Sequence, residues 1–228
     1  MTSAEAPHPQ VKICGLTRVD EALACAELGA DAIGFVFFSK SPRNLRIDQA
    51  REIARALPDH VAKVGVFVND SYDSIMEKVD ACGLSVVQLH GDEPPELVAK
   101  FHTTRLTVVK CLYMENAPFI AQAPDYHAAG YLVECKKGIL PGGNALTWNW
   151  EKAKSFGETY PLILAGGLSS DNIYEAIMSA HPDGVDISSG VESVPGRKDI
   201  AKVKLFIEKV HQAAIPEPAG RTTLRRIF

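Results

Sequence analysis

The 228-residue sequence has few cysteines, no long apolar run and no large excess of charge of either sign. The cysteine count is odd, the spacings are wide and no Cys-x-x-Cys pair occurs, which argues against a disulfide framework or a zinc knuckle. A reducing, cytoplasmic location is therefore predicted. No stretch of about 18 apolar residues exists, so no membrane span is predicted. The first ten residues lack the basic start and apolar run of a secretory signal.

The charge balance limits the partners that the chain can bind. With 24 lysines and arginines against 28 aspartates and glutamates, the net charge is −4. The chain therefore lacks the excess of positive charge that is typical of proteins that bind nucleic acid. Hydrophobic residues make up 46% and charged residues 23%, as in an ordinary folded chain. The length allows one large domain or two small ones.

Short apolar segments alternate with amphipathic segments along most of the chain. The apolar segments are predicted strands, at residues 11–14, 32–37, 61–68, 85–89, 106–112, 130–134, 162–166 and 183–188. The amphipathic segments are predicted helices, at residues 20–29, 48–57, 71–80, 94–101, 170–180 and 197–210. Continuous apolar strands are expected where both faces of a parallel sheet are covered by helices.

Two α/β architectures fit this alternation, a closed barrel and a doubly wound open sheet. The units are evenly spaced at roughly 25 residues each, close to the minimum for a strand, a turn and a helix. No Gly-x-Gly-x-x-Gly pattern follows the first strand, where a dinucleotide fold would need it, and the glycine-rich turns follow the last two strands instead. We therefore predict a single (β/α)₈ TIM barrel of eight parallel strands over residues 11–213. Residues 1–10 and the arginine-containing residues 214–228 are predicted to be flexible tails.

In such a barrel, functional side chains lie at the carboxyl ends of the strands. Gly166 and Gly167 follow the seventh predicted strand, and Ser188, Ser189 and Gly190 follow the eighth. Backbone N–H groups in loops at these two positions commonly hold a phosphate group. These residues are therefore predicted to bind phosphate, with tight turns alone as the structural alternative.

The other candidates are a thiol, two carboxyls, an imidazole and a guanidinium. Cys14 ends the first strand, where a nearby cation would favour its thiolate as a base, although a buried cysteine is more often simply apolar packing. Glu134 and Asp186 end apolar strands, where a carboxyl can act as an acid, bind a hydroxyl or anchor a loop. His90 can carry a proton, hold a ligand or pack in the core. Arg43 suits a substrate carboxylate, with a solvated surface position as the alternative.

Seven segments together resemble the phosphoribosylanthranilate isomerase family. They are KICGLTR (12–18), GADAIGFVFFSKSPR (29–43), VGVFVN (64–69), QLHGDE (88–93), PGGN (141–144), ILAGGL (163–168) and VDISSGVESVPGRKD (185–199). The resemblance implies a (β/α)₈ barrel of tryptophan biosynthesis that needs no metal or organic cofactor. The implied reaction is the Amadori rearrangement of N-(5′-phosphoribosyl)anthranilate, a small-molecule substrate, to 1-(2-carboxyphenylamino)-1-deoxyribulose 5-phosphate. The chain is expected to be a monomer or a homodimer.

The resemblance also implies roles for the candidate residues. Cys14 matches the general base, Arg43 the residue that holds the anthranilate carboxylate, and His90 and Asp186 further active-site positions. The family's general acid is an aspartate, whereas this sequence has Glu134. The extra methylene shifts the carboxyl by roughly an ångström, and a displacement of that size can cost about 10²-fold in rate. We still expect isomerase activity with Glu134 as the acid.

Three alternatives remain at this point. The first is isomerisation of a different phosphorylated amino-sugar, as in the related histidine-pathway enzyme, but that family uses two aspartates and not a cysteine base. The second is a barrel that binds a phosphorylated sugar or aromatic acid without turnover, because the usual acid has changed. The third is other chemistry that employs Cys135, Lys136 and Lys137 in the altered loop after the sixth strand.

Overall fold

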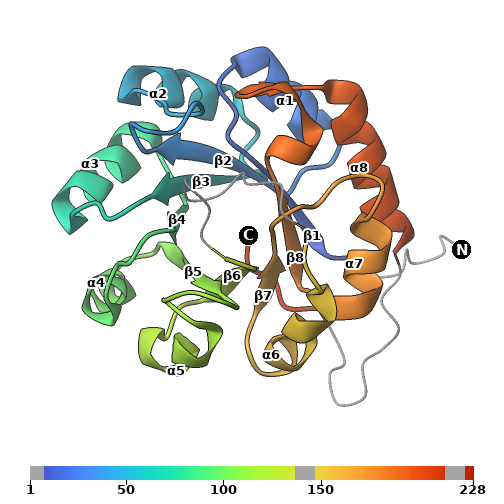
Figure 1. Ribbon diagram of the computed structural model, residues 1–228. Helices are drawn as coiled ribbons and strands as arrows, with labels where there is room; N and C mark the ends of the chain where they lie inside the picture. Colours follow the sequence, from blue (N-terminus) through green and yellow to red (C-terminus); the bar gives the residue numbers. More distant parts are fainter. Residues whose placement is uncertain (1–7, 137–146, 214–223) are drawn as a thin grey trace, which may run out of the picture.

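The computed structural model describes residues 8–136, 147–213 and 224–228 and forms a closed barrel of eight parallel strands in chain order (Figure 1). The strands are β1 (Gln10–Cys14), β2 (Ala32–Phe37), β3 (Ala62–Phe67), β4 (Val86–Leu89), β5 (Thr107–Tyr113), β6 (Gly130–Glu134), β7 (Leu162–Leu164) and β8 (Gly184–Ile187). The predicted (β/α)₈ architecture is confirmed, and the doubly wound alternative is wrong because β1 pairs with both β2 and β8.

Helices follow the strands and form a ring around the barrel (Figure 1). They are α1 (Val19–Glu27), α2 (Ile47–Ala56), α3 (Tyr72–Cys82), α4 (Pro95–Lys100), α5 (Ala123–Tyr126), α6 (Lys154–Thr159), α7 (Ile173–Ala180) and α8 (Ile200–Gln212). The sequence did not predict α5 and α6. None of the helices in the described part of the chain is long and apolar enough to cross a membrane.

Two apolar layers hold the barrel together, one inside it and one between the strands and the helices. Side chains that alternate along each strand divide between the layers. In β2, for example, Ile33 and Phe35 pack under the helices, whereas Ala32 faces the interior. Gly34 lies beside Cys14 in the β1–β2 register, and a Cβ there would lie 2.8 Å from the Cys14 sulfur. A glycine at this position therefore leaves room for the thiol.

A small antiparallel hairpin separates β8 from α8. It consists of β9 (Glu192–Val194) and β10 (Arg197–Lys198), and β10 lies within residues 197–210, which the sequence pattern predicts to be a helix. The helix starts later because Asp199 caps it, and the Asp199 carboxylate accepts hydrogen bonds from the backbone amides of Ala201 and Lys202 at 3.0 and 3.2 Å. The hairpin places Glu192 at the rim of the barrel.

The last five residues lie against the amino ends of the strands. Ile227 is buried and joins the apolar cluster inside the barrel. The Gln10 side chain donates to the backbone oxygen of Phe228 at 3.0 Å and accepts from the amides of Ile227 and Phe228 at 2.7 and 3.1 Å. An apolar anchor and paired backbone groups thus order the terminus. Residues 1–7 and 214–223 of the two predicted tails lie outside the described residues.

Deleting Leu224–Phe228 is expected to destabilise the barrel. The deletion exposes the pocket that Ile227 fills and leaves the Gln10 carboxamide without these partners, a loss of about 2–4 kcal/mol. For a domain of this size the midpoint of thermal unfolding should fall by roughly 5–10 °C. Circular dichroism would measure it. Turnover at 25 °C serves as the control and should be unchanged because the segment lies at the opposite end from the strands' carboxyl ends. An unchanged midpoint would contradict this role.

Candidate active site

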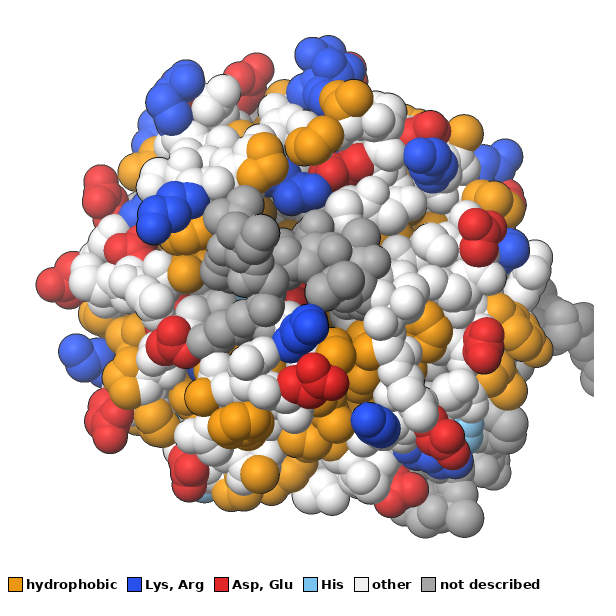
Figure 2. All heavy atoms as spheres, in the orientation of Figure 1, with side chains coloured by type: hydrophobic (Ala, Val, Ile, Leu, Met, Phe, Trp, Pro, Cys, Tyr) orange, Lys and Arg blue, Asp and Glu red, His pale blue; other side chains and the backbone are white. Residues whose placement is uncertain are grey.

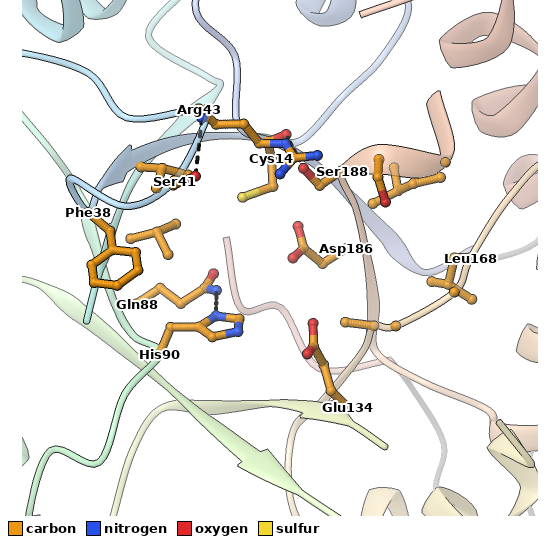
Figure 3. A pocket seen from close by; sticks show the side chains of 18 of the residues that line it. Cys14, Phe38, Ser41, Arg43, Gln88, His90, Glu134, Leu168, Asp186 and Ser188 are labelled. Carbon is orange, nitrogen blue, oxygen red and sulfur yellow. Dashed lines mark hydrogen bonds between the residues drawn. The ribbon is translucent and has the colours of Figure 1, made fainter. Parts of the chain in front are cut away.

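A pocket of about 860 Å³, including its open mouth, lies at the carboxyl ends of the strands. All ten site residues predicted from the sequence line it, namely Cys14, Arg43, His90, Glu134, Gly166, Gly167, Asp186, Ser188, Ser189 and Gly190. Figure 3 shows that the Cys14 sulfur and the Glu134 carboxyl point into the cavity from opposite sides, with Asp186 between them. The fold therefore brings together residues that are up to 176 positions apart, Cys14 and Gly190.

Cys14 shares the inner face of β1 with Lys12, two residues earlier, because side chains alternate along a strand. Lys12 is completely buried, and its Nζ lies 2.7 Å from Oδ1 of Asp186. Burial raises the pKa of the Cys14 thiol above its ordinary value, and the charge of Asp186 adds to this, whereas Lys12 and Lys198 act in the opposite direction. The cations therefore offset part of the cost of forming a thiolate in the barrel interior.

Glu134 is the last residue of β6, and the residue is 7% exposed. Burial raises the pKa of Glu134 to about 8, the charge of Asp186 adds to the shift, and Lys12 opposes it. The carboxyl consequently holds its proton at neutral pH, which suits a group that donates a proton to a bound ligand. Asp186, in contrast, is paired with Lys12.

His90 follows β4, and its ring is held against a glutamine side chain. Nδ1 of His90 lies 2.9 Å from Nε2 of Gln88, and both side chains are buried in the pocket wall (Figure 3). A second buried pair fixes the loop that carries His90. Lys110 Nζ lies 2.8 Å from Glu93 Oε2 and donates to the backbone oxygen of Gly91 at 2.8 Å. This network gives the pocket a rigid polar wall.

Arg43 reaches the pocket from the loop after β2, where its guanidinium already has a partner. Its Nε and Nη2 donate to Oε1 and Oε2 of Glu192 at 2.7 and 2.6 Å. Glu192 also accepts from Nζ of Lys198 at 2.8 Å. One edge of the arginine is thus taken by an internal carboxylate, so a bound carboxylate would have to use the other edge.

The loops after β7 and β8 have backbones that only small residues allow. Gly166 and Gly167 have φ angles of +84° and +68°, in the left-handed region that favours glycine. A Cβ on Gly190 would overlap the backbone oxygen of Leu168. The Trp148 indole donates to the backbone oxygen of Ala165 at 3.0 Å and braces the first loop. These loops can bring backbone groups close to an anion.

The sequence did not single out as functional candidates Gln88, which lines the pocket, or Glu192, which pairs with the pocket residue Arg43. Gln88 and Glu192 lie inside segments that carried the family resemblance, but a single sequence gives no sign of which partner each contacts. Lys12 could be expected near the site from the sequence, because it lies two residues before Cys14 and its side chain therefore shares a face of the strand with Cys14. Cys135 and Lys136 also line the pocket. Lys137 and residues 141–144, named in the sequence analysis, lie outside the described residues.

The face that carries the pocket has no large region of one charge (Figure 2). Lysine and arginine side chains alternate with aspartate and glutamate around the described part of its rim. Within residues 8–136, 147–213 and 224–228, no three histidine, cysteine, aspartate or glutamate side chains are grouped as metal ligands would be. The fold and the position of the pocket are those of a (β/α)₈-barrel enzyme, with a thiol, carboxyls and glycine-containing loops around one cavity.

Comparison with known proteins identifies the family. Residues 11–209 match the model of the N-(5′-phosphoribosyl)anthranilate isomerase family. The chain is 48% identical over 206 residues to the N-(5′-phosphoribosyl)anthranilate isomerase of Desulfatibacillum aliphaticivorans, covering 90% of this chain and 94% of that protein. The chain belongs to the phosphoribosylanthranilate isomerase family of tryptophan biosynthesis, as the sequence segments indicated.

Solved structures agree with this assignment. The phosphoribosylanthranilate isomerase of Thermotoga maritima superposes with a TM-score of 0.83 at 38% identity, covering 90% of this chain and 99% of that one. A crystal structure of the isomerase in complex with reduced 1-(o-carboxyphenylamino)-1-deoxyribulose 5-phosphate gives a TM-score of 0.80 at 36% identity, with the same coverage. These similarities favour the isomerase over the non-catalytic and repurposed alternatives.

Proposed function

We propose that this chain catalyses the Amadori rearrangement of N-(5′-phosphoribosyl)anthranilate with Cys14 as the general base and Glu134 as the general acid. The observation that carries the proposal is their placement on opposite sides of one pocket (Figure 3). Burial raises the pKa of Glu134 to about 8, which favours the protonated acid at neutral pH. The reaction needs both groups, because ring opening needs a proton at the ring oxygen and enolamine formation needs a base at the adjacent carbon.

The substrate has two anionic ends, and the pocket offers a place for each. The phosphate is assigned to the loops at Gly166–Gly167 and Ser188–Gly190, whose backbones approach closely. The anthranilate carboxylate is assigned to the free edge of Arg43. Anchoring both ends holds the sugar across the space between Cys14 and Glu134, which supplies the proximity that proton transfer requires.

The proton transfers then follow in order. Glu134 gives its proton to the furanose ring oxygen, the bond from that oxygen to C1 breaks, and the anilino nitrogen lone pair forms a C=N bond. The Cys14 thiolate removes the proton from C2, and the electron pair moves to give the enolamine. In the tautomerisation of the enolamine, C1 takes the proton held by Cys14 and the C2 hydroxyl gives its proton to the Glu134 carboxylate, which yields the 2-keto product and restores both groups. Asp186 and His90 lie beside this path and are assigned to the sugar hydroxyls and the pocket wall.

The raised pKa values of Cys14 and Glu134 predict an alkaline optimum for kcat/KM. The active form needs the Cys14 thiolate, whose pKa burial raises, together with protonated Glu134, whose pKa is about 8. The acid Glu134 therefore has a lower pKa than the base Cys14. Only a small fraction of the enzyme carries protonated Glu134 and the Cys14 thiolate together, and this fraction is largest at a pH between the two pKa values. We expect kcat/KM to rise with pH up to about 8 and to peak above it. A maximum near pH 6 would contradict the assignment of the two groups.

The test of the proposed function is a turnover assay with the full chain and N-(5′-phosphoribosyl)anthranilate, followed by the loss of substrate fluorescence. Catalysed loss by the wild-type chain, abolished in a double variant of Cys14→Ser and Glu134→Gln, is the expected result. Saturable binding of the substrate without turnover would show the non-catalytic alternative to be right. A cytoplasmic location and a monomeric or homodimeric state accompany this proposal.

A further inference from the structure

A chain of buried polar contacts connects the substrate arginine to the rest of the site. Arg43 is bonded through two nitrogens to Glu192, and Lys198 bonds to the same carboxylate at 2.8 Å. Lys198 also donates to the backbone oxygen of Ser188 at 3.0 Å, and the Ser188 hydroxyl donates to the backbone oxygen of Cys14 at 3.1 Å. The hairpin residue Glu192 is therefore the link between Arg43 and the loop after β8.

We propose that Glu192 is a positioning residue that sets the plane of the Arg43 guanidinium and leaves its outer edge free for the substrate carboxylate. The proposal rests on the proposed function of this pocket. It concerns the side-on pairing of Arg43 Nε and Nη2 with the two oxygens of Glu192. Among the residues that the structure describes, Arg43 Nη1 has no hydrogen-bond acceptor, so Nη1 and the second N–H of Nη2 remain for a ligand.

The geometry favours positioning over competition with the substrate. An arginine side chain has many rotamers, and holding it in one of them before the ligand arrives lowers the entropy lost on binding. Glu192 and Arg43 are 5% and 11% exposed, so the pair is protected from water. Burial lowers the pKa of Lys198, and the charge of Glu192 acts in the opposite direction. With Lys198 protonated, the cluster of two cations and one carboxylate carries a net positive charge beside an anionic substrate.

The charge state of Glu192 is consistent with this role. Burial alone would raise the pKa of Glu192, but its hydrogen bonds and charge interactions with Arg43 and Lys198 outweigh burial and lower it. The carboxylate is therefore ionised at the pH of the reaction, and both of its oxygens remain acceptors for Arg43.

The experiment measures kcat, KM and the binding of anthranilate for Glu192→Gln in the full chain. A neutral amide has one acceptor oxygen and cannot hold both Arg43 nitrogens, so KM should rise by about 10- to 100-fold, as expected when a charge-assisted pair is lost. The rate constant kcat should change less than about threefold because Glu192 does not touch the reacting atoms. Calorimetry with anthranilate as the probe should show the same loss of affinity without any turnover.

A matched control is available in α1, where a glutamate contacts the same hairpin. Glu21 is buried and accepts from Arg197 Nε at 2.6 Å and from the Lys198 amide at 2.9 Å, but it does not contact Arg43. Glu21→Gln should leave KM and anthranilate affinity within about twofold of wild type. Glu192→Asp, which keeps the charge and withdraws it by one methylene, should lie between wild type and Glu192→Gln, and it replaces that variant if the amide does not fold.

A double-mutant cycle separates positioning from general stabilisation. If Glu192 acts through Arg43, then adding Glu192→Gln to Arg43→Gln should change KM by less than about twofold. If Glu192→Gln and Arg43→Gln raised KM by independent factors that multiply in the double variant, the proposal would be overturned. An unchanged or lowered KM in Glu192→Gln alone would also overturn it. The outcome also separates this inference from the proposed function. Anthranilate binding that depends on Glu192 without turnover would overturn the isomerase assignment alone, whereas turnover with an unchanged KM would overturn the positioning role alone.

Discussion

Replacing Glu134 by Gln is expected to lower kcat by about 10²- to 10⁴-fold while KM stays within a few-fold of wild type. The amide has nearly the same shape as the acid but has no proton to give to the ring oxygen. Glu134 is buried with a pKa of about 8, so the wild-type side chain holds that proton at neutral pH. Steady-state fluorescence kinetics would measure both constants. An unchanged kcat would remove Glu134 from the mechanism.

Glu134→Asp is the matched control for this result. It keeps a carboxylic acid but withdraws it by one methylene from a position set by the end of β6 (Gly130–Glu134). A shift of about an ångström should reduce kcat by roughly 10- to 100-fold, less than the loss of the acid itself. If kcat of Glu134→Asp were as low as that of Glu134→Gln, the position of the carboxyl, and not the presence of its proton, would limit the reaction.

Replacing Cys14 by Ser is the second change with a large expected effect, a fall in kcat of about 10²- to 10⁴-fold. A serine hydroxyl has far less tendency to ionise than a thiol, even though burial raises the pKa of Cys14. Lys12 favours the thiolate of Cys14, but it cannot produce an alkoxide at neutral pH. The substrate should still bind because its charged ends are held elsewhere in the pocket.

The control for Cys14 is another buried cysteine. Cys25 lies in α1 under the apolar layer, away from the pocket, and burial raises its pKa to about 12. Cys25→Ala should leave kcat and KM unchanged apart from a modest loss of stability. Comparable losses of kcat in both variants would mean that the Cys14 result reflects damage to the fold and not the removal of a base.

The sequence predicted most of the barrel because its strands are continuous apolar segments. The limits of β2 and β6 were predicted correctly at residues 32–37 and 130–134, where Asp31 precedes the first apolar run and Gly130 and Glu134 bound the second. The helix α5 was missed because four residues are too few for an amphipathic period, and α6 was missed because its six residues, with Gly157 among them, show no such period. The hairpin before α8 was missed because its residues alternate weakly and are mostly polar.

The site was predictable where a residue ends a strand, and less so where its partner is distant in sequence. Cys14 and Glu134 follow from the rule that barrel strands point their carboxyl ends at the site. The pairing of Arg43 with Glu192 joins residues 149 positions apart, which no local pattern reveals. The same holds for the contact of Ile227 with the barrel interior. Such contacts depend on where the closed sheet brings its loops and not on local sequence.

The central claim is that Glu134 is a protonated acid facing Cys14 in the free enzyme. Infrared difference spectra of wild type minus Glu134→Gln, recorded as a function of pH, measure that proton directly. Because burial raises the pKa of Glu134 to about 8, the carbonyl band of a protonated carboxyl should be present at pH 7 and should disappear as the pH passes through that value. A carboxylate signal alone at pH 7 would contradict the account.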